Sequence, residues 1–190
     1  MSSITFCNDS NKMVIDGCPD AVKAISLEGN LAKRLAELTL HLQDLTDAEN
    51  YLRAANTISA DPVVYRALAH SAVVTFMKCF GRSKARFSLD SQIFNKSGST
   101  VLSSFLFFGN LRDKHIAHDE NPFSMCLTFA LINDGNKPYK VENVYAIAMA
   151  ARFLDQEKLN ELAGLIEIAK AWIQEQSTKL REKNKRRVGA

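Results

Sequence analysis

The chain has 190 residues, of which 46% are hydrophobic and 24% charged, and its formal net charge is +3. This composition is ordinary for a globular protein, so it excludes a largely disordered or fibrous chain, and the small net charge excludes a polycation. The length suits a single domain with one hydrophobic core.

No segment of the sequence reads as a secretory signal or as a membrane-spanning helix. The first residues lack a basic region followed by a long apolar run, and no stretch approaches the roughly 18 apolar residues that a spanning helix needs. The four cysteines show no Cys-x2-Cys spacing. We therefore expect a cytoplasmic protein without membrane contact, whose cysteines are reduced and in which Cys126 is buried.

The N-terminal half predicts a flexible arm followed by a helix. Polar residues and glycine or proline dominate residues 1–20, which are typical of a flexible arm. From Ser26, a plausible N-cap, leucines recur at helical spacing and predict a helix with one apolar face. They are Leu27, Leu31, Leu35, Leu38, Leu42 and Leu45. A coiled-coil seam and core packing in a helical bundle explain this stripe equally well.

A second helix is expected from the pair Asp61-Pro62, which resembles an N-cap followed by proline at the first helical position. It runs to about Cys79 and ends at Gly81, because glycine favours a helix C-terminus. Residues 82–99 then form a long connection, a feature that is often functional in a compact domain. Its basic side chains, Arg82, Lys84 and Arg86, are candidate RNA contacts.

The third expected helix spans roughly residues 99–117 and carries an apolar stripe at Val101, Phe105 and Phe108. Continued at the same spacing, this stripe reaches Arg112 and His115. The polar pair therefore lies on the line of a buried face, and we expect it to face a partner surface or a cleft.

The remaining chain predicts two more helices around a turn. Residues 125–140 contain a strong turn signal and predict a short hairpin or an irregular insertion. Helix is expected again over 141–153, and a long final helix follows the potential N-cap Asp155. The sum is an all-α bundle of four to five helices, organised as one domain over residues 21–180 with a basic tail at 181–190.

The densest group of reactive side chains lies between Arg112 and Glu120. RNA cleavage without a metal needs a base for the ribose 2′-hydroxyl, an acid for the leaving oxygen and positive charge for the phosphate. Histidine can serve the first two roles, and the planar fork of arginine fits phosphate oxygens.

The arrangement Arg112-x5-His118, within the sequence Leu-Arg-Asp-Lys-His-Ile-Ala-His at the end of an apolar helix, resembles the Arg-x(4–6)-His signature of the HEPN superfamily. The surrounding sequence is similar to its abortive-infection-like members. The resemblance covers roughly residues 30–175 and is specific over 101–120.

This resemblance implies a metal-independent endoribonuclease without cofactors that acts as a toxin or antiviral effector. It implies a homodimer through the helix that carries Phe105, Phe108 and Arg112, so that the Arg/His pairs of two subunits form a composite site in a cleft at the interface. It also implies a nucleotidyltransferase-like antitoxin as a further partner. Arg112 then maps to the phosphate-binding residue and His118 to the catalytic histidine.

Two neighbours complete the expected catalytic set: Asp113 occupies a polar position often found after the arginine, and His115 assists. We also assign Lys114 to RNA binding.

Several alternatives remain open at this point. On a straight helix, positions 112 and 118 are about 240° apart, so the helix bends, a second subunit completes the site, or His115 is the working histidine. A metal held by the histidines and acids of residues 115–120 is a weaker reading, because the spacing matches no tight motif. The alternative function is a non-catalytic HEPN-like dimer that binds a nucleotide or a protein.

Overall fold

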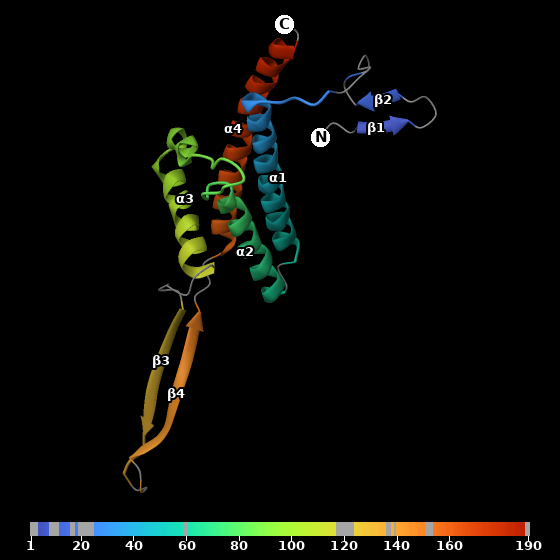
Figure 1. The fold of residues 1–190 in the computed structure, drawn as a ribbon. Coiled ribbons are helices and arrows are strands. Elements are labelled where there is room, and N and C mark those ends of the chain that lie inside the picture. Colours follow the sequence, from blue (N-terminus) through green and yellow to red (C-terminus); the bar gives the residue numbers. More distant parts are fainter. Residues whose placement is uncertain are drawn as a thin grey trace.

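The computed structural model describes residues 4–7, 12–15, 18, 25–58, 61–116, 124–135, 138, 140–150 and 154–188. In these residues four α-helices form the body of the molecule (Figure 1). They are α1 (Asn30–Thr57), α2 (Pro62–Lys78), α3 (Ser99–Leu111) and α4 (Gln156–Val188). The predicted all-α bundle is thus confirmed.

Two antiparallel hairpins accompany the bundle. Near the N-terminus β1 (Ile4–Cys7) pairs with β2 (Lys12–Ile15), which the expectation of an irregular arm did not foresee. The second hairpin joins β3 (Ser124–Ile132) to β4 (Val141–Ala150) and projects from one end of the body (Figure 1). The predicted hairpin near 125–140 is therefore longer than expected.

The helix predicted over 141–153 is wrong over residues 141–150, and residues 151–153 lie outside the described part of the chain. In the structure β4 is a strand, with Val144, Tyr145 and Ile147 among its residues, and such β-branched and aromatic side chains suit a strand. Pairing with β3 across the turn decides between the two conformations, because local propensity alone is a weak determinant.

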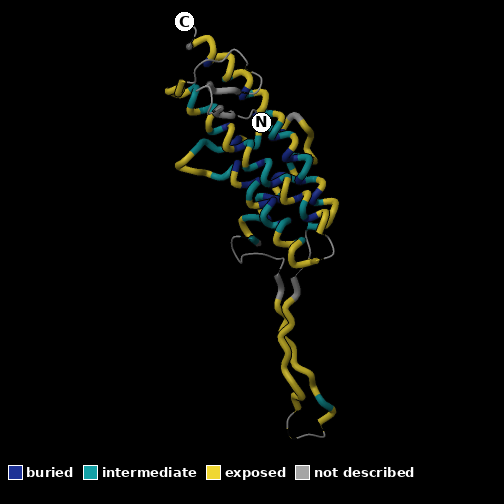
Figure 2. The backbone as a smooth tube through the Cα atoms, turned by 90° about the vertical axis from the view of Figure 1, so that its right-hand side faces the viewer, coloured by how far each residue is buried: buried dark blue, intermediate teal, exposed yellow. Residues whose placement is uncertain are grey.

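The core lies where all four helices meet, while the β3–β4 hairpin is exposed along its described length (Figure 2). An aromatic cluster joins α2 and α3 to the connection between them. The ring of Phe94, from the 3-10 helix η1 (Ser91–Ser97), lies 5.0 Å from that of Phe105 and 5.5 Å from that of Phe80. The long 82–99 connection is consequently anchored in the core.

The helix ends follow local capping chemistry in two of three predicted cases. Asp61 accepts hydrogen bonds from the backbone N–H groups of Val63 and Val64 at 2.9 and 3.1 Å, as predicted. Asp155 accepts one from Lys158 N at 2.9 Å. Ser26 is not a cap, because α1 begins after Gly29. The basic C-terminal residues up to Val188 belong to α4 itself.

Replacing Asp61 tests whether its side chain caps the N-terminus of α2. Asp61→Ala should lower the free energy of unfolding by about 1 kcal/mol, because it removes the acceptor for the first N–H groups of α2. Urea unfolding followed by circular dichroism measures the change. Asp61→Asn, which keeps a side-chain oxygen, is the matched control, and an equal loss in both variants would contradict the capping role.

Candidate functional site

Arg112 stands where α3 ends and beside the end of α2. Its Nε donates to Asp113 Oδ1 at 2.6 Å, and its Nη2 lies 2.5 Å from the same oxygen. Its Nη1 lies 3.4 Å from the position that a Cβ on Gly81 would take, so the guanidinium lies against Gly81. The Arg112 side chain is 28% exposed and that of Asp113 is 57% exposed, which places this ion pair at the surface.

The winding of the chain changes at Arg112. The α-helix gives way there to a π-helical turn, η2 (Arg112–Ile116). Wide turns of this kind occur frequently at functional sites. The straight α-helix assumed for positions 112 and 118 therefore does not hold over Arg112–Ile116, and His118 lies outside the described residues.

The other predicted site residues fall into three groups. Lys114, Arg82 and Lys84 are exposed, as an RNA contact requires. His115 is described in its backbone only. His118 lies outside the described residues, as do Asp119 and Glu120 of the metal alternative. The structure thus brings Arg112 to the end of α2, next to the start of the basic connection.

Two residues of the helix predicted to form the homodimer face inward. Phe105 is 8% exposed and Phe108 is fully buried, and both face the core of their own chain. The apolar stripe of α3 is therefore used up by intramolecular packing, and these two rings are not available to a second subunit.

Arg86 is also placed differently from an RNA-binding residue. Its guanidinium pairs with Asp44 of α1, and the two side chains are only 11% and 13% exposed. Lys78 Nζ binds the other oxygen of the same carboxylate at 3.0 Å. The structure gives Arg86 a role in fixing the 82–99 connection to α1.

This pairing sets the protonation of Asp44. Burial by itself raises the pKa of the carboxyl, but the hydrogen bonds and positive charges of Arg86 and Lys78 outweigh it, and the net pKa is lower than usual. Asp44 therefore remains ionised near neutral pH and cannot act as a proton donor there.

A buried histidine borders this ion pair. His41 is 1% exposed, and its Nε2 donates to the backbone oxygen of Phe87 at 2.8 Å. Its Nδ1 is buried without a hydrogen-bond partner among the described residues. Burial is the main cause that lowers the pKa of His41, so the ring is neutral.

The potential metal-ligand atoms of His41, Asp44 and Cys79 lie within 4.8 Å of one another, a spacing that a metal ion could bridge. The chemistry of the group disfavours a cation, however. Asp44 already holds two cationic side chains, and burial raises the pKa of the Cys79 thiol to about 12, far from the thiolate that a metal binds. We assign the cluster a structural role.

Sequence reasoning missed this cluster, although one signal for it was available. His41 and Asp44 follow Leu38 at intervals of three residues, on or beside the buried face of α1. A histidine in phase with a leucine stripe is a candidate for a buried polar contact. Asp44 pairs with Arg86, which lies 42 residues further along the chain, so no local sequence pattern predicts this contact.

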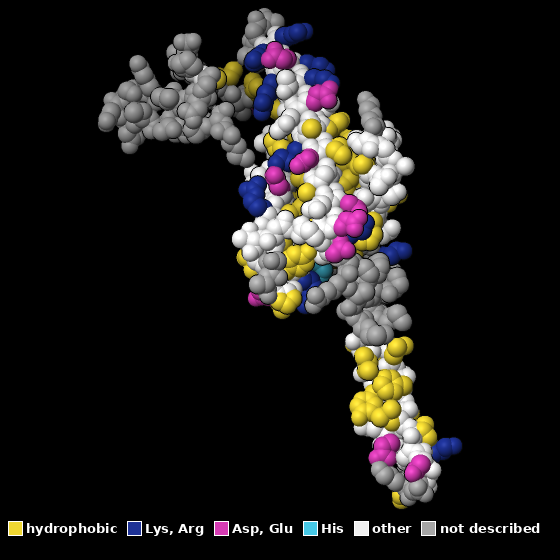
Figure 3. Space-filling view, turned by 180° about the vertical axis from the view of Figure 1, so that it is seen from behind, with side chains coloured by type: hydrophobic (Ala, Val, Ile, Leu, Met, Phe, Trp, Pro, Cys, Tyr) yellow, Lys and Arg dark blue, Asp and Glu magenta, His cyan; other side chains and the backbone are white. Residues whose placement is uncertain are grey.

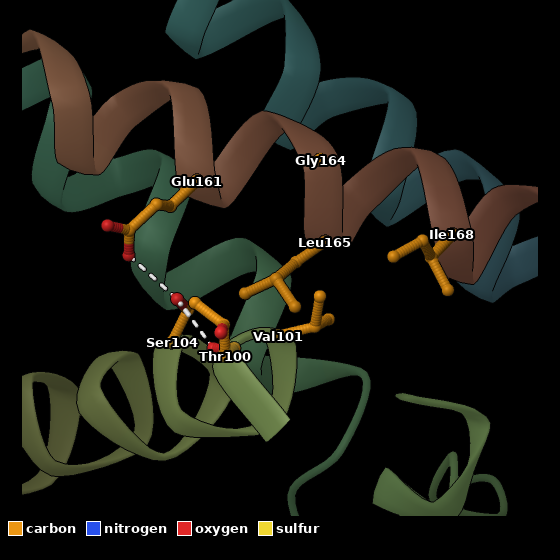
Figure 4. A pocket seen from close by; sticks show the side chains of 7 residues that line it. All are labelled: Thr100, Val101, Ser104, Glu161, Gly164, Leu165 and Ile168. Carbon is orange, nitrogen blue, oxygen red and sulfur yellow. Dashed lines mark hydrogen bonds between the residues drawn. The ribbon is translucent and has the colours of Figure 1, made fainter. Parts of the chain in front are cut away.

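A groove of about 210 Å³ lies between α3 and α4 (Figure 4). Its polar groups satisfy each other: Ser104 Oγ donates to Glu161 at 2.8 Å, and Lys158 Nζ donates to the same carboxylate at 2.6 Å. The bond from Lys158 is the main cause that lowers the pKa of Glu161. With its polar atoms engaged and its volume below the roughly 300 Å³ typical of ligand sites, the groove offers no reactive centre.

Comparison of the chain with protein-family models, curated proteins and solved structures gives no significant match. Within the described residues, none of the helices combines the length and apolar character needed to cross a bilayer.

The structural role of Arg86 predicts a specific loss of stability. Arg86→Met should lower the free energy of unfolding by about 3 kcal/mol, because it leaves the mostly buried Asp44 without its closest partner. Arg82→Met and Lys84→Met, at exposed positions of the same connection, should change it by less than about 0.5 kcal/mol. Equal effects of all three substitutions in chemical denaturation would contradict the assignment.

The neutral His41 predicts acid sensitivity. The pKa of His41 in the folded protein lies below the ordinary 6.5. As pH falls below 6.5, the histidine of the unfolded chain therefore binds a proton before the histidine of the folded chain does. Stability from this residue is intact above that pH and declines below it, by at most about 1.4 kcal/mol per pH unit.

His41→Gln keeps a donor for Phe87 O and does not titrate, so its unfolding free energy should fall less steeply over the same pH range. Parallel slopes for the two proteins would show that His41 is not responsible.

Proposed function

We propose that this chain is a HEPN-like, metal-independent endoribonuclease in which Arg112 binds the scissile phosphate and His118 is the general acid and base. The observation that carries the proposal is the π-helical turn beginning at Arg112, where a partly exposed guanidinium lies at the start of the signature of that superfamily. The identity of the histidine rests on the resemblance in sequence.

The Arg112–Asp113 pair is compatible with phosphate binding. Exposed ion pairs contribute only about 0–1 kcal/mol, so a phosphate group can replace the Asp113 carboxylate at little cost. Arginine pairs with phosphate through two parallel hydrogen bonds, which strengthens the exchange. Asp113 in this view holds the guanidinium ready for the substrate.

The surrounding charges suit a polyanionic substrate. Lys114 is exposed beside Arg112, and Arg82 follows the Gly81 against which the guanidinium lies. Contacts from these residues and Lys84 to neighbouring phosphates would position the strand and add salt dependence to binding. Arg86 is left out of the RNA-binding set because of its partner Asp44.

In the proposed reaction, His118 removes the proton of a ribose 2′-hydroxyl, which attacks the adjacent phosphorus, and a proton is delivered to the departing 5′-oxygen. Arg112 stabilises the negative charge that develops on the phosphate oxygens. His115 assists in proton transfer. A cytoplasmic toxin or antiviral effector restrained by a nucleotidyltransferase-like antitoxin is the biological setting that the superfamily resemblance suggests.

Cleavage of RNA in the presence of EDTA tests the proposal. The wild-type chain should cleave, and Arg112→Ala and His118→Ala should each reduce the rate by roughly a hundredfold or more, because each removes a group that acts in the transition state. Arg53→Ala, which removes an exposed arginine of α1, is the matched control and should retain activity.

Cleavage that EDTA abolishes, or that both substitutions leave intact, would refute the mechanism. Asp113→Asn provides a further check, since it should keep or strengthen RNA binding by releasing Arg112 from a charged neighbour.

The second candidate is a non-catalytic helical binding module. The ion pair between Arg112 and Asp113 favours it, because the guanidinium already has a carboxylate partner within its own chain. This function predicts RNA or protein binding without cleavage, and a weaker effect of His118→Ala than of Arg112→Ala on affinity.

A further inference from the structure

The β3–β4 hairpin has two chemically different faces. Side chains alternate along a strand, so residues paired across the ribbon share a face. One face carries large apolar side chains, namely Leu127, Phe129 and Leu131 of β3 with Tyr145 and Ile147 of β4. The opposite face carries mostly small ones, including Cys126, Thr128 and Ala130 with Ala146 and Ala148, and Val144 is its larger apolar exception. We call the first set the large apolar face.

The large apolar face is uncovered. Its five residues are 42–48% exposed, and in the described residues neither strand contacts a helix of the body. Figure 3 shows hydrophobic side chains along the length of the hairpin, with charged ones confined to its far end. Cys126, expected to be buried, is exposed on the other face.

Such a ribbon is not stable by itself in water. An isolated two-stranded sheet is marginal, and a hydrophobic face normally packs on a helix or on further strands. Here an aromatic pair already rigidifies the centre of the face, since the Phe129 and Tyr145 rings stack at 5.8 Å. Preordered aromatic side chains of this kind are typical anchors of protein interfaces.

We propose that the large apolar face packs against the same face of a second copy of this chain, so that two hairpins form a two-layered β-structure at the centre of a homodimer. A second copy is the occupant that fits because β3 carries no charge and β4 carries only Glu142 at its start. An apolar, self-matching surface suits an isologous contact about a two-fold axis.

The area corresponds to a small interface, of the kind found in weak dimers. At roughly 200 Å² for a fully exposed residue of this size, the five exposed fractions leave on the order of 450 Å² of surface in each copy. Complete burial of these residues in two copies would remove about 900 Å², just under the roughly 1,000 Å² lower bound of a specific interface, before flanking residues are added.

This dimer contact uses a different surface from the one expected on α3, and it does not depend on the ribonuclease activity. Phe105 and Phe108 serve the core of the protomer, whereas the hairpin has no such use for its side chains. The two proposals also occupy different residues, so each can fail without the other.

Sedimentation velocity of the full chain over nanomolar to tens of micromolar concentrations tests the dimer. The wild type should be dimeric at micromolar concentration. Phe129→Thr/Tyr145→Thr keeps a strand-forming cross-strand pair but removes the aromatic anchors, and should raise the dissociation constant roughly tenfold or more. Ala130→Thr/Val144→Thr introduces the same threonine pair on the opposite face. This variant should keep the dissociation constant within about twofold of the wild-type value.

Two further measurements separate the dimer from other causes. The helical unfolding transition of both double variants should match the wild type at a concentration where all are monomeric, since the hairpin does not pack on the body. Alkylation of Cys126 should proceed equally in monomer and dimer, because this thiol faces away from the contact.

A monomeric wild type at tens of micromolar, equal weakening by both double variants, or protection of Cys126 in the dimer would each overturn the proposal. So would a wild type that stays monomeric in buffer and instead binds neutral phosphatidylcholine vesicles through the large apolar face.

Discussion

The aromatic cluster around Phe94 determines how the chain between α2 and α3 is arranged. Phe94 is fully buried although it belongs to a connection rather than to a long helix, and its ring contacts Phe76 and Phe80 of the α2 end and Phe105 of α3. Burying one phenylalanine contributes about 1.5–3 kcal/mol, which offsets part of the conformational entropy lost when the connection is ordered. The end of α3, and with it Arg112, is thereby brought to Gly81.

The same connection is fixed at a second point by charge. Asp44 of α1 binds Arg86, while Arg82 and Lys84 remain in solvent. Three basic residues that look equivalent in the sequence therefore have different tasks, because only one of them reaches a carboxylate inside the protein. The exposed basic residues of the connection are therefore Arg82 and Lys84, which make no ion pair with Asp44.

The apolar side chains of the helices and those of the β3–β4 hairpin lie in different surroundings. Core residues of the helices, such as the fully buried Phe108, pack within the chain, whereas the large apolar face of the β3–β4 hairpin is left open. Exposed apolar surface of this extent is characteristic of an interaction site. The proposed chemistry at Arg112 and the proposed self-association at the hairpin thus belong to separate parts of one protein.

The sequence alone determined the helical class, the start of α2 at Asp61 and that of α4 at Asp155, because caps and apolar periodicity act over a few residues. It also placed Val101, Phe105 and Phe108 on one face of α3. Tertiary structure decided that this face is filled by Phe94 instead of a partner, that Arg86 is buried, and that residues 141–150 form a strand. Each of these depends on contacts between residues far apart in the chain, for which local patterns carry no information.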